Sequence, residues 1–282
     1  MIILLYGIIY FKGGTAELIY YIILFISFYI AVSTVTVYGI LDRWFWPWIA
    51  LLVFINVFML CVAAHLIYCA VLSVFVDKKK PILHQNRYYY HLLVQTAFLI
   101  IRTLRVKISV SGEELVPENG NFLLVCNHIH WLDPAVPLLL FKKRHIAFVS
   151  KKETHSYPVA GSFLHQAACL PIDRENDREA LKTINKAAQF ITDGVCSIGI
   201  YPEGWVSRDG TLQDFRHGAF RIAKKAGCPV VVTHISGTDK VLVPFWKKRK
   251  INFEIKGVIP SEFVKTHKTI EISDLAREIM EK

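Results

Sequence analysis

Charged residues are nearly absent from the first 76 residues of this 282-residue chain. That segment contains only Lys12, Glu17, Asp42 and Arg43 as charged side chains, with a net charge of zero. Because a soluble domain needs a charged surface, this scarcity excludes an ordinary soluble fold for the segment. The formal net charge of +10 therefore belongs to residues 77–282, where 31 basic residues face 21 acidic ones. A basic part attached to a membrane favours anionic phosphate head groups over nucleic acid as its partners.

The chain also lacks the spacing of a disulfide framework or a metal site. None of its six cysteines belongs to a Cys-x-x-Cys pair, which predicts reduced thiols. Cys126 lies two residues before His128, but its place in an apolar run favours packing over nucleophilic catalysis. His128 and His130 form a His-x-His pair without a third or fourth ligand at suitable spacing. The sequence therefore predicts no bound metal and no resident cofactor.

Two long segments without charge, residues 18–41 and 48–76, stand in the first quarter of the chain. As helices, both are long enough to cross a hydrocarbon core of about 30 Å. The aromatic residues of 42–48 favour a membrane–water interface, and the basic cluster at 77–81 favours the cytoplasmic side. Residues 1–81 are therefore predicted to form a two-helix hairpin in the cell membrane, with the rest of the chain on the cytoplasmic side. A hairpin that enters only one leaflet fits the same pattern.

Residues 82–282 are predicted to form one α/β domain with a largely parallel sheet flanked by helices. Residues 87–104 predict a helix that lies in the membrane interface or is buried in the domain, and residues 106–111 predict a half-exposed strand. Further strands are predicted at 122–126, 145–150, 168–172, 195–201, 230–235 and 251–258. Helices are predicted at 134–141, 158–166, 177–192, 218–226 and 272–282.

A histidine and an aspartate follow the strand predicted at 122–126. His128 lies just beyond its end, and Asp133 precedes Pro134. Asp before Pro is a helix-start signal, which predicts that Asp133 caps the following helix with one oxygen. Its other oxygen would hold the His128 ring and leave the far ring nitrogen free as a base. On spacing alone, a solvated histidine beside an ordinary cap is the more common arrangement.

Further motifs follow in a recognisable order. Arg174 lies just beyond a predicted strand, where a guanidinium is suited to bind phosphate through two parallel hydrogen bonds. Residues 201–204 read Tyr-Pro-Glu-Gly, and residues 215–219 read Phe-Arg-His-Gly-Ala. With the His-x-x-x-x-Asp segment in front of them, these motifs resemble the signatures of the 1-acylglycerol-3-phosphate acyltransferases, a family of the glycerolipid acyltransferase superfamily. The resemblance covers residues 127–232.

The resemblance implies roles for single residues. It makes His128 and Asp133 the catalytic pair, and it assigns binding of the acceptor substrate to a set of four residues: Arg174, Glu203, Gly204 and Arg208. The family's usual Thr-Arg after this glycine is replaced by Trp205-Val206. The replacement removes a basic residue from the phosphate site, so Arg208 or Arg216 would have to supply the charge.

The resemblance also implies a reaction. A fatty acyl group would pass from an acyl thioester, carried by acyl carrier protein or coenzyme A, to the sn-2 hydroxyl of 1-acyl-glycerol 3-phosphate. The product would be phosphatidic acid for phospholipid synthesis. The implied partners are this lysophospholipid, the acyl thioester, membrane phospholipids and acyl carrier protein, but no nucleic acid. Glycerol 3-phosphate or another lysolipid as acceptor, a lipid transacylase, and a phosphatidate-binding module without activity remain alternatives.

Overall fold

The computed structural model describes residues 15–207, 210–241 and 249–282 of the chain. The chain divides into two compact units, and the boundary between them falls between Val76 and Asp77.

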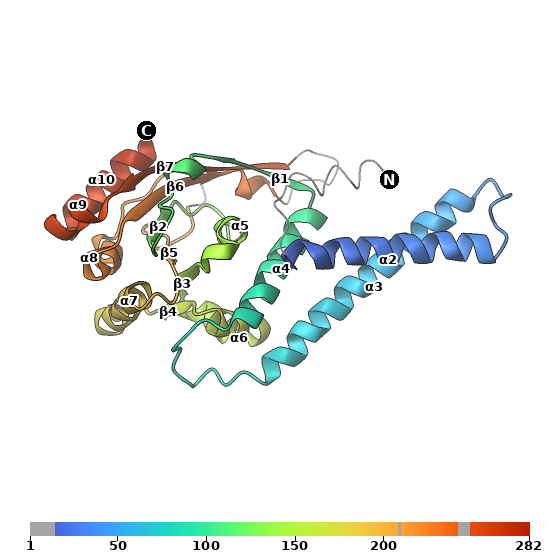
Figure 1. Ribbon diagram of the computed structural model, residues 1–282, viewed down its shortest axis with the longest axis horizontal. Coiled ribbons are helices and arrows are strands. Elements are labelled where there is room, and N and C mark those ends of the chain that lie inside the picture. The colour runs from blue at the N-terminus through green and yellow to red at the C-terminus, as the bar shows by residue number, and fades with distance from the viewer. Residues whose placement is uncertain (1–14, 208–209, 242–248) are drawn as a thin grey trace. The chain divides into compact units, whose positions relative to one another are not determined.

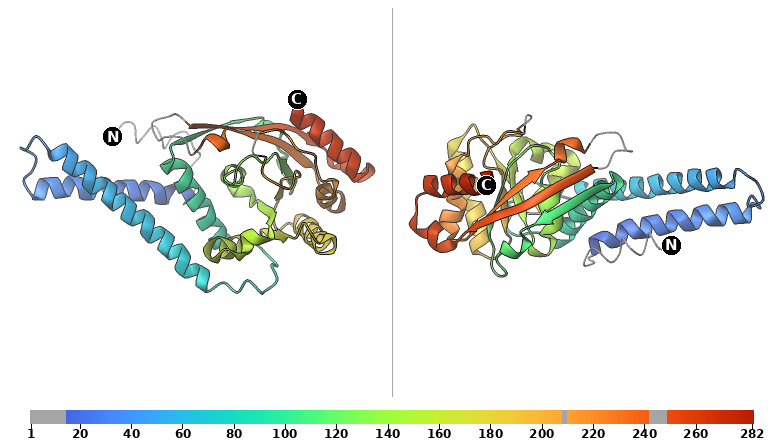
Figure 2. Two further views of the ribbon diagram at one scale, coloured as in Figure 1. Left: turned by 180° about the vertical axis from the view of Figure 1, so that it is seen from behind. Right: turned by 90° about the horizontal axis from the view of Figure 1, so that it is seen from above.

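The first unit is a pair of long helices, α2 (Thr15–Val37) and α3 (Trp46–Val74). The two helices run side by side (Figures 1 and 2), and the rings of Tyr20 and Phe58 meet between them at 6.5 Å. By length and composition, both helices are capable of crossing a membrane. The structure therefore confirms two long apolar helices at the front of the chain.

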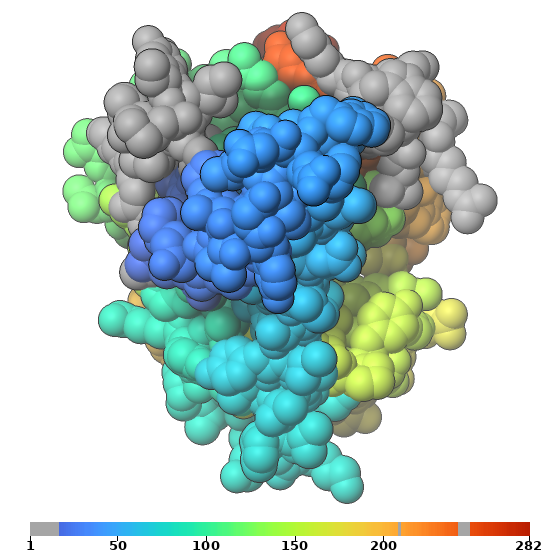
Figure 3. Space-filling view, turned by 90° about the vertical axis from the view of Figure 1, so that its right-hand side faces the viewer, coloured from blue at the N-terminus to red at the C-terminus, as the bar shows by residue number. Residues whose placement is uncertain are grey.

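The turn between these helices, residues 38–45, is rich in aromatic side chains. Tyr38 and Trp44 expose 74% and 84% of their surface, and Trp46 and Trp48 are also exposed. Figure 3 looks onto this end of the helix pair, drawn in blue. Exposed tryptophan and tyrosine at the end of an apolar helix are typical of the head-group region of a bilayer.

The second unit is built on a seven-stranded sheet, counted over the described residues, with the order β1-β7-β6-β2-β5-β3-β4. All neighbouring strands run parallel except β6 and β7, which are antiparallel. The largely parallel sheet that the sequence predicts is therefore confirmed. The strands are β1 (Val106–Ser111), β2 (Leu123–Cys126), β3 (Ala147–Lys151), β4 (Leu170–Ile172), β5 (Ile198–Ile200), β6 (Val230–Ser236) and β7 (Arg249–Ile259).

Helices cover both faces of the sheet (Figure 1). One face carries α4 (Arg87–Thr103), α5 (Ala135–Leu140) and α6 (Pro158–Gln166). The other carries α7 (Asp177–Thr192), α8 (Arg221–Ala226) and α10 (Thr269–Glu281), with α9 (Ser261–Thr266) beside α8 and α10. Short 3-10 turns connect the elements: η1 (Glu113–Leu115), η2 (Lys142–Arg144), η3 (Lys152–Ser156), η4 (His217–Phe220) and η5 (Thr238–Lys240).

The burial of helix α4 distinguishes between the two locations predicted for residues 87–104, the membrane interface and the interior of the domain. Its apolar face is buried, including Tyr90, which has no exposed surface, and Phe98 and Ile101, which have almost none. Only part of the helix, such as Tyr88, faces outward. The structure therefore supports the buried alternative over a helix that lies flat in the membrane interface.

Several boundaries differ from the prediction. The helix predicted from residue 218 begins as the 3-10 turn η4 and becomes α-helical only at Arg221. The last helix begins at Thr269 rather than residue 272, since the Glu271 side chain accepts the Lys268 backbone N–H at 2.6 Å and so stabilises an earlier start. The strand predicted at 195–201 is shorter, Ile198–Ile200.

The order of strands decides where a site belongs. The connection from β2 runs to β3 on one side of the sheet, whereas the connection from its neighbour β5 runs to β6 on the other side. In open α/β sheets a crevice forms at the carboxyl ends of the strands on either side of such a point. The first residues beyond β2 are Asn127 and His128.

Candidate active site

Asn127 fixes the end of strand β2 against strand β6. Its side chain is buried, its Oδ1 accepts the Ile235 backbone N–H at 2.7 Å, and its Nδ2 donates to the Ile235 carbonyl at 3.0 Å. These two bonds continue the sheet pairing by one residue, so the chain leaves the sheet in a defined direction. His128 therefore starts from a rigid position.

His128 and Asp133 form the pair that the sequence predicts as catalytic. His128 Nδ1 and Asp133 Oδ2 are 2.8 Å apart, and the Asp133 side chain is fully buried whereas 16% of the His128 side chain is exposed. Because an ionised carboxylate only accepts, Nδ1 is the donor of this pair, and in the neutral ring Nε2 keeps its lone pair. The geometry thus presents Nε2 as a base toward the pocket that His128 lines.

The prediction that Asp133 caps the following helix is wrong. Helix α5 begins at Ala135, and no side chain caps its first turn. Asp133 Oδ2 instead accepts the backbone N–H groups of Ile129 and His130, both at 2.8 Å, because the loop folds back over the carboxylate. Its Oδ1 accepts the hydroxyl of the buried Thr238 at 2.5 Å. Thr238 follows strand β6, and no signal near Asp133 in the sequence points to it.

Glu203 lies behind His128 rather than in the pocket. Its side chain is 1% exposed, its Oε1 accepts the His128 backbone N–H at 2.7 Å, and its Oε2 accepts the Gln213 backbone N–H at 3.0 Å. Burial raises the pKa of this carboxyl, although the two N–H groups favour the ionised form. Glu203 does not line the pocket. In this structure the Glu203 carboxylate therefore holds the backbone of His128 and Gln213, and its predicted contact with the substrate stays a prediction.

We expect Glu203→Gln to lower both activity and stability. An amide has one oxygen, so the N–H of His128 or of Gln213 would face an NH2 group in a buried site. An unsatisfied buried donor costs about 1–3 kcal/mol, and thermal unfolding of the purified variant measures the loss. We expect kcat to fall roughly 10-fold through the displaced His128, within the effect of a small misplacement of a catalytic group.

The exposed Glu278, paired with Lys282 at 2.7 Å, supplies the control for this variant. Glu278→Gln should leave both measurements at the wild-type value. An unchanged kcat in Glu203→Gln would contradict the positioning role.

Two further contacts hold the His128 ring and backbone. The Tyr201 ring stacks on the imidazole with centroids 4.3 Å apart and planes at 26°. The Ser207 backbone N–H donates to the His128 carbonyl at 2.7 Å. Tyr201 belongs to the Tyr-Pro-Glu-Gly motif. Its stacking on His128 requires the segment after β5 to lie beside the segment after β2, which the sequence does not predict.

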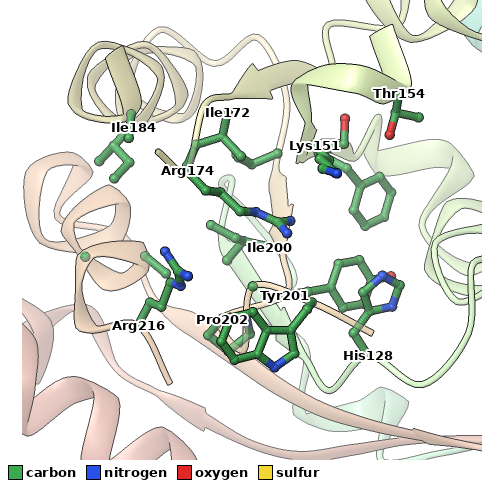
Figure 4. A pocket seen from close by; sticks show the side chains of 18 of the residues that line it. His128, Lys151, Thr154, Ile172, Arg174, Ile184, Ile200, Tyr201, Pro202 and Arg216 are labelled. Carbon is green, nitrogen blue, oxygen red and sulfur yellow. The ribbon is translucent and has the colours of Figure 1, made fainter. Parts of the chain in front are cut away.

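A pocket of about 1460 Å³ opens above the strand ends (Figure 4). His128 and Tyr201 stand at one side of it, and Ile172 and Ile184 at another. Its walls are largely apolar, but the described residues that line it include only one acidic side chain, Asp177. Five basic side chains line it: Lys151, Arg174, Arg178, Arg216 and Arg221. The pocket therefore combines apolar walls with a net positive charge.

The structure brings two of the four predicted binding residues to this pocket. Arg174 and Gly204 line it, whereas Arg208 lies outside the described residues. Burial lowers the pKa of the Arg174 guanidinium, and the charge of nearby Arg216 lowers it further. Arg216, which the sequence offers as a substitute for the missing basic residue, also points into the pocket.

The alternative chemistries receive no support from the geometry. Cys126 is 2% exposed in strand β2 and does not line the pocket, and burial raises the pKa of its thiol, which opposes nucleophilic use. All six cysteines lie in the described part of the chain and are free thiols. Over residues 15–207, 210–241 and 249–282, no three His, Cys, Asp or Glu side chains are grouped so that they could hold a metal ion.

Comparisons with known proteins show which proteins this chain is similar to. A family model described as Acyltransferase matches residues 107–236. The chloroplastic 1-acyl-sn-glycerol-3-phosphate acyltransferase BAT2 of Brassica napus is 31% identical over 48% of this chain and 39% of its own length. The 1-acyl-sn-glycerol-3-phosphate acyltransferase of Bacillus subtilis is 28% identical over 50% of this chain and 68% of its own length.

A solved structure shares the fold. The crystal structure of the 1-acyl-sn-glycerophosphate (LPA) acyltransferase from Thermotoga maritima superposes with a TM-score of 0.57 at 21% identity, covering 76% of this chain and 84% of that one. At this identity the match shows a shared fold. The chain is thus similar to 1-acyl-sn-glycerol-3-phosphate acyltransferases, and the Acyltransferase model matches a little under half of it. The chain spans only about two fifths of the length of the Brassica napus relative.

Proposed function

We propose that this protein transfers a fatty acyl group from an acyl thioester to the sn-2 hydroxyl of 1-acyl-glycerol 3-phosphate and so forms phosphatidic acid. The observation that carries the proposal is the His128–Asp133 pair, joined at 2.8 Å, at the wall of a large apolar pocket with a net positive charge. The pair supplies a base, the apolar walls suit acyl chains, and the positive charge suits a phosphate.

In the proposed mechanism His128 acts as a general base. Its Nε2 takes the proton from the acceptor hydroxyl while that oxygen attacks the thioester carbonyl and forms a tetrahedral intermediate. The intermediate collapses, the C–S bond breaks, and the imidazolium returns the proton to the leaving thiolate. Asp133 stabilises the imidazolium and keeps the ring in one orientation. The acyl group passes directly to the acceptor, without a covalent acyl-enzyme.

The negative charge on the tetrahedral oxygen needs a partner. The backbone N–H groups of His128, Ile129 and His130 already donate to Glu203 and Asp133. In the proposed mechanism the oxyanion is therefore met by the basic side chains that line the pocket rather than by these three N–H groups.

The proposal also covers where the reaction takes place. Helices α2 and α3 are long and apolar enough to anchor the chain. The cluster Asp77-Lys78-Lys79-Lys80-Pro81 that follows them supports an orientation in which the second unit lies on the cytoplasmic side of the cell membrane. The acyl thioester is carried by acyl carrier protein or coenzyme A, and no metal or other cofactor takes part. Lysophospholipid and product remain in the bilayer.

A panel of acceptors tests this proposal. Membranes that contain the full chain are incubated with an acyl thioester and, in parallel, lysophosphatidic acid, glycerol 3-phosphate or a neutral lysolipid, and the products are followed by mass. We expect phosphatidic acid to form from lysophosphatidic acid only when wild-type chain is present. Acylation of another acceptor in its place would overturn the acceptor assignment, and lipid binding without any acylation would favour a phosphatidate-binding module.

A further inference from the structure

Two arginines from distant parts of the chain point into the same pocket. Arg174 follows strand β4 and Arg216 precedes the turn η4, and Figure 4 shows both guanidinium groups directed into the cavity. The effect of the Arg216 charge on the pKa of Arg174 shows that the two groups are electrostatically close. Two like charges held near one another are unfavourable unless an anion joins them.

Neither guanidinium is neutralised by a carboxylate within the described part of the chain. Asp173 pairs with Lys152 at 3.2 Å, and Asp214 pairs with Arg277 at 2.6 Å. Glu153, whose charge raises the pKa of Arg174, pairs with Lys151 at 3.5 Å. Asp177 also lines the pocket, but five basic side chains line it as well, so the net positive charge favours an anionic ligand.

The segment around Arg216 is built to hold this side chain in place. The Trp205 ring lies beneath its guanidinium, 5.5 Å from centroid to Cζ, and the Arg216 backbone N–H donates to the Pro202 carbonyl at 2.9 Å. Gly204 has a φ of +85°, and a Cβ there would come within 2.9 Å of Arg216 Nε. Glycine at 204 and tryptophan at 205 therefore make room for Arg216 and support it, where an arginine on a bare surface would be mobile.

We propose that Arg174 and Arg216, the latter held by Trp205, bind the terminal phosphate monoester of the acceptor together and so select it over lysolipids whose phosphate is a diester. This inference rests on the proposed function and names the residues that set its acceptor specificity. Arg216 is then a specificity-determining residue that touches substrate, and Trp205 is a positioning residue.

The selectivity follows from charge and geometry. A phosphate monoester carries about −1.5 to −2 charge near neutral pH and has three terminal oxygens. A diester carries one charge and has two free oxygens. Each guanidinium takes up to two oxygens as a planar fork. Two guanidinium groups therefore match the charge and the three terminal oxygens of a monoester. A diester has too few free oxygens and too little charge to pair fully with both.

Steady-state kinetics of the full chain in mixed micelles test the assignment. The substrates are lysophosphatidic acid and, as the diester, lysophosphatidylglycerol with the same acyl chain, and the variant is Arg216→Gln. We expect its KM for lysophosphatidic acid to rise about 10- to 100-fold, the effect of one charge-assisted hydrogen-bonding group, while kcat changes little. The preference for monoester over diester should fall by a similar factor, and Arg216→Lys should restore part of it.

Arg102 supplies a matched control, because its guanidinium also lies over an aromatic ring, Phe98, at 5.7 Å but does not line the pocket. Arg102→Gln should keep the wild-type preference. A KM that rises equally for monoester and diester in Arg216→Gln, or that does not change, would overturn the proposal.

Binding separates this inference from the proposed function. Radiolabelled lysophosphatidic acid is bound to the full chain in detergent on a His128→Ala background, which removes the base without touching either arginine. We expect Arg216→Gln to weaken this binding by the same factor. If binding depends on Arg216 but the wild type acylates nothing, the proposed reaction is wrong and the two-arginine site stands. If the wild type acylates lysophosphatidic acid but neither binding nor acylation depends on Arg216, the proposed reaction stands and the two-arginine site is wrong.

Discussion

Replacing His128 with alanine is expected to lower kcat for acyl transfer by about 10²- to 10⁴-fold, the usual contribution of a positioned general base. The variant removes Nε2, the atom that takes the acceptor's proton, while the backbone N–H of residue 128 still donates to Glu203. Its fold should therefore survive. The measurement is phosphatidic acid formed per enzyme at saturating substrates, at equal amounts of folded protein.

A neighbouring histidine supplies the control for this prediction. His130 is two residues away, and its backbone N–H donates to Asp133, a bond that alanine keeps. Of the hydrogen bonds of His130, alanine loses only a long one, in which the His130 Nδ1 accepts the Leu132 backbone N–H at 3.4 Å. His130→Ala should retain activity close to the wild type. Undiminished activity in His128→Ala would rule out His128 as the general base for any acceptor.

Asp133→Asn is expected to lower kcat by about 10²- to 10³-fold, because it removes the negative charge beside the His128 ring. The position of Oδ2 faces three donors, His128 Nδ1 and the N–H groups of Ile129 and His130, so the amide oxygen must occupy it. The amide nitrogen then faces the Thr238 hydroxyl, which can accept. The ring therefore keeps its orientation and tautomer, and what is lost is the negative charge that stabilises the imidazolium, about 4 kcal/mol at an effective dielectric constant of 20.

Thr238→Val separates charge from orientation at the same carboxylate. It removes one hydroxyl donor from Oδ1 but leaves the charge and the three donors on Oδ2. We expect kcat to fall much less than in Asp133→Asn. Equal losses in the two variants, measured by the same phosphatidic acid assay, would mean that placement of the carboxylate, rather than its charge, limits the reaction.

The elements of the second unit could be predicted because each leaves a local pattern. Helix α7 was expected at residues 177–192 and occupies Asp177–Thr192, since its apolar residues recur at helical spacing after the capping Asn176. The direction of β7 could not be predicted in the same way. Alternating apolar residues mark a strand but carry no information about its orientation, and β7 runs antiparallel to β6.

The same difference between local and long-range information applies to the site. His128, Asp133, Arg174 and Gly204 lie in motifs that are contiguous in sequence, and all except the buried Asp133 line the pocket. What holds them in place is not local. Thr238 reaches Asp133 across 105 residues, and Glu203 reaches the His128 backbone across 75. Such pairings depend on which strands become neighbours in the sheet, so the sequence could predict neither the bond from Thr238 nor the bond from Glu203 to the His128 backbone, and the predicted role of Asp133 as a helix cap is wrong.

Direct transfer from thioester to acceptor is the central claim, and thiol release by the purified full chain tests it most directly. The chain is mixed with acyl thioester with and without lysophosphatidic acid, and thiol, phosphatidic acid and the intact mass of the protein are followed together. We predict that thiol and phosphatidic acid appear in equal amounts, only when acceptor is present, and that the protein stays unmodified. A burst of thiol without acceptor, together with an acyl adduct on the protein that lysophosphatidic acid then removes, would contradict a general-base role for His128 in direct transfer.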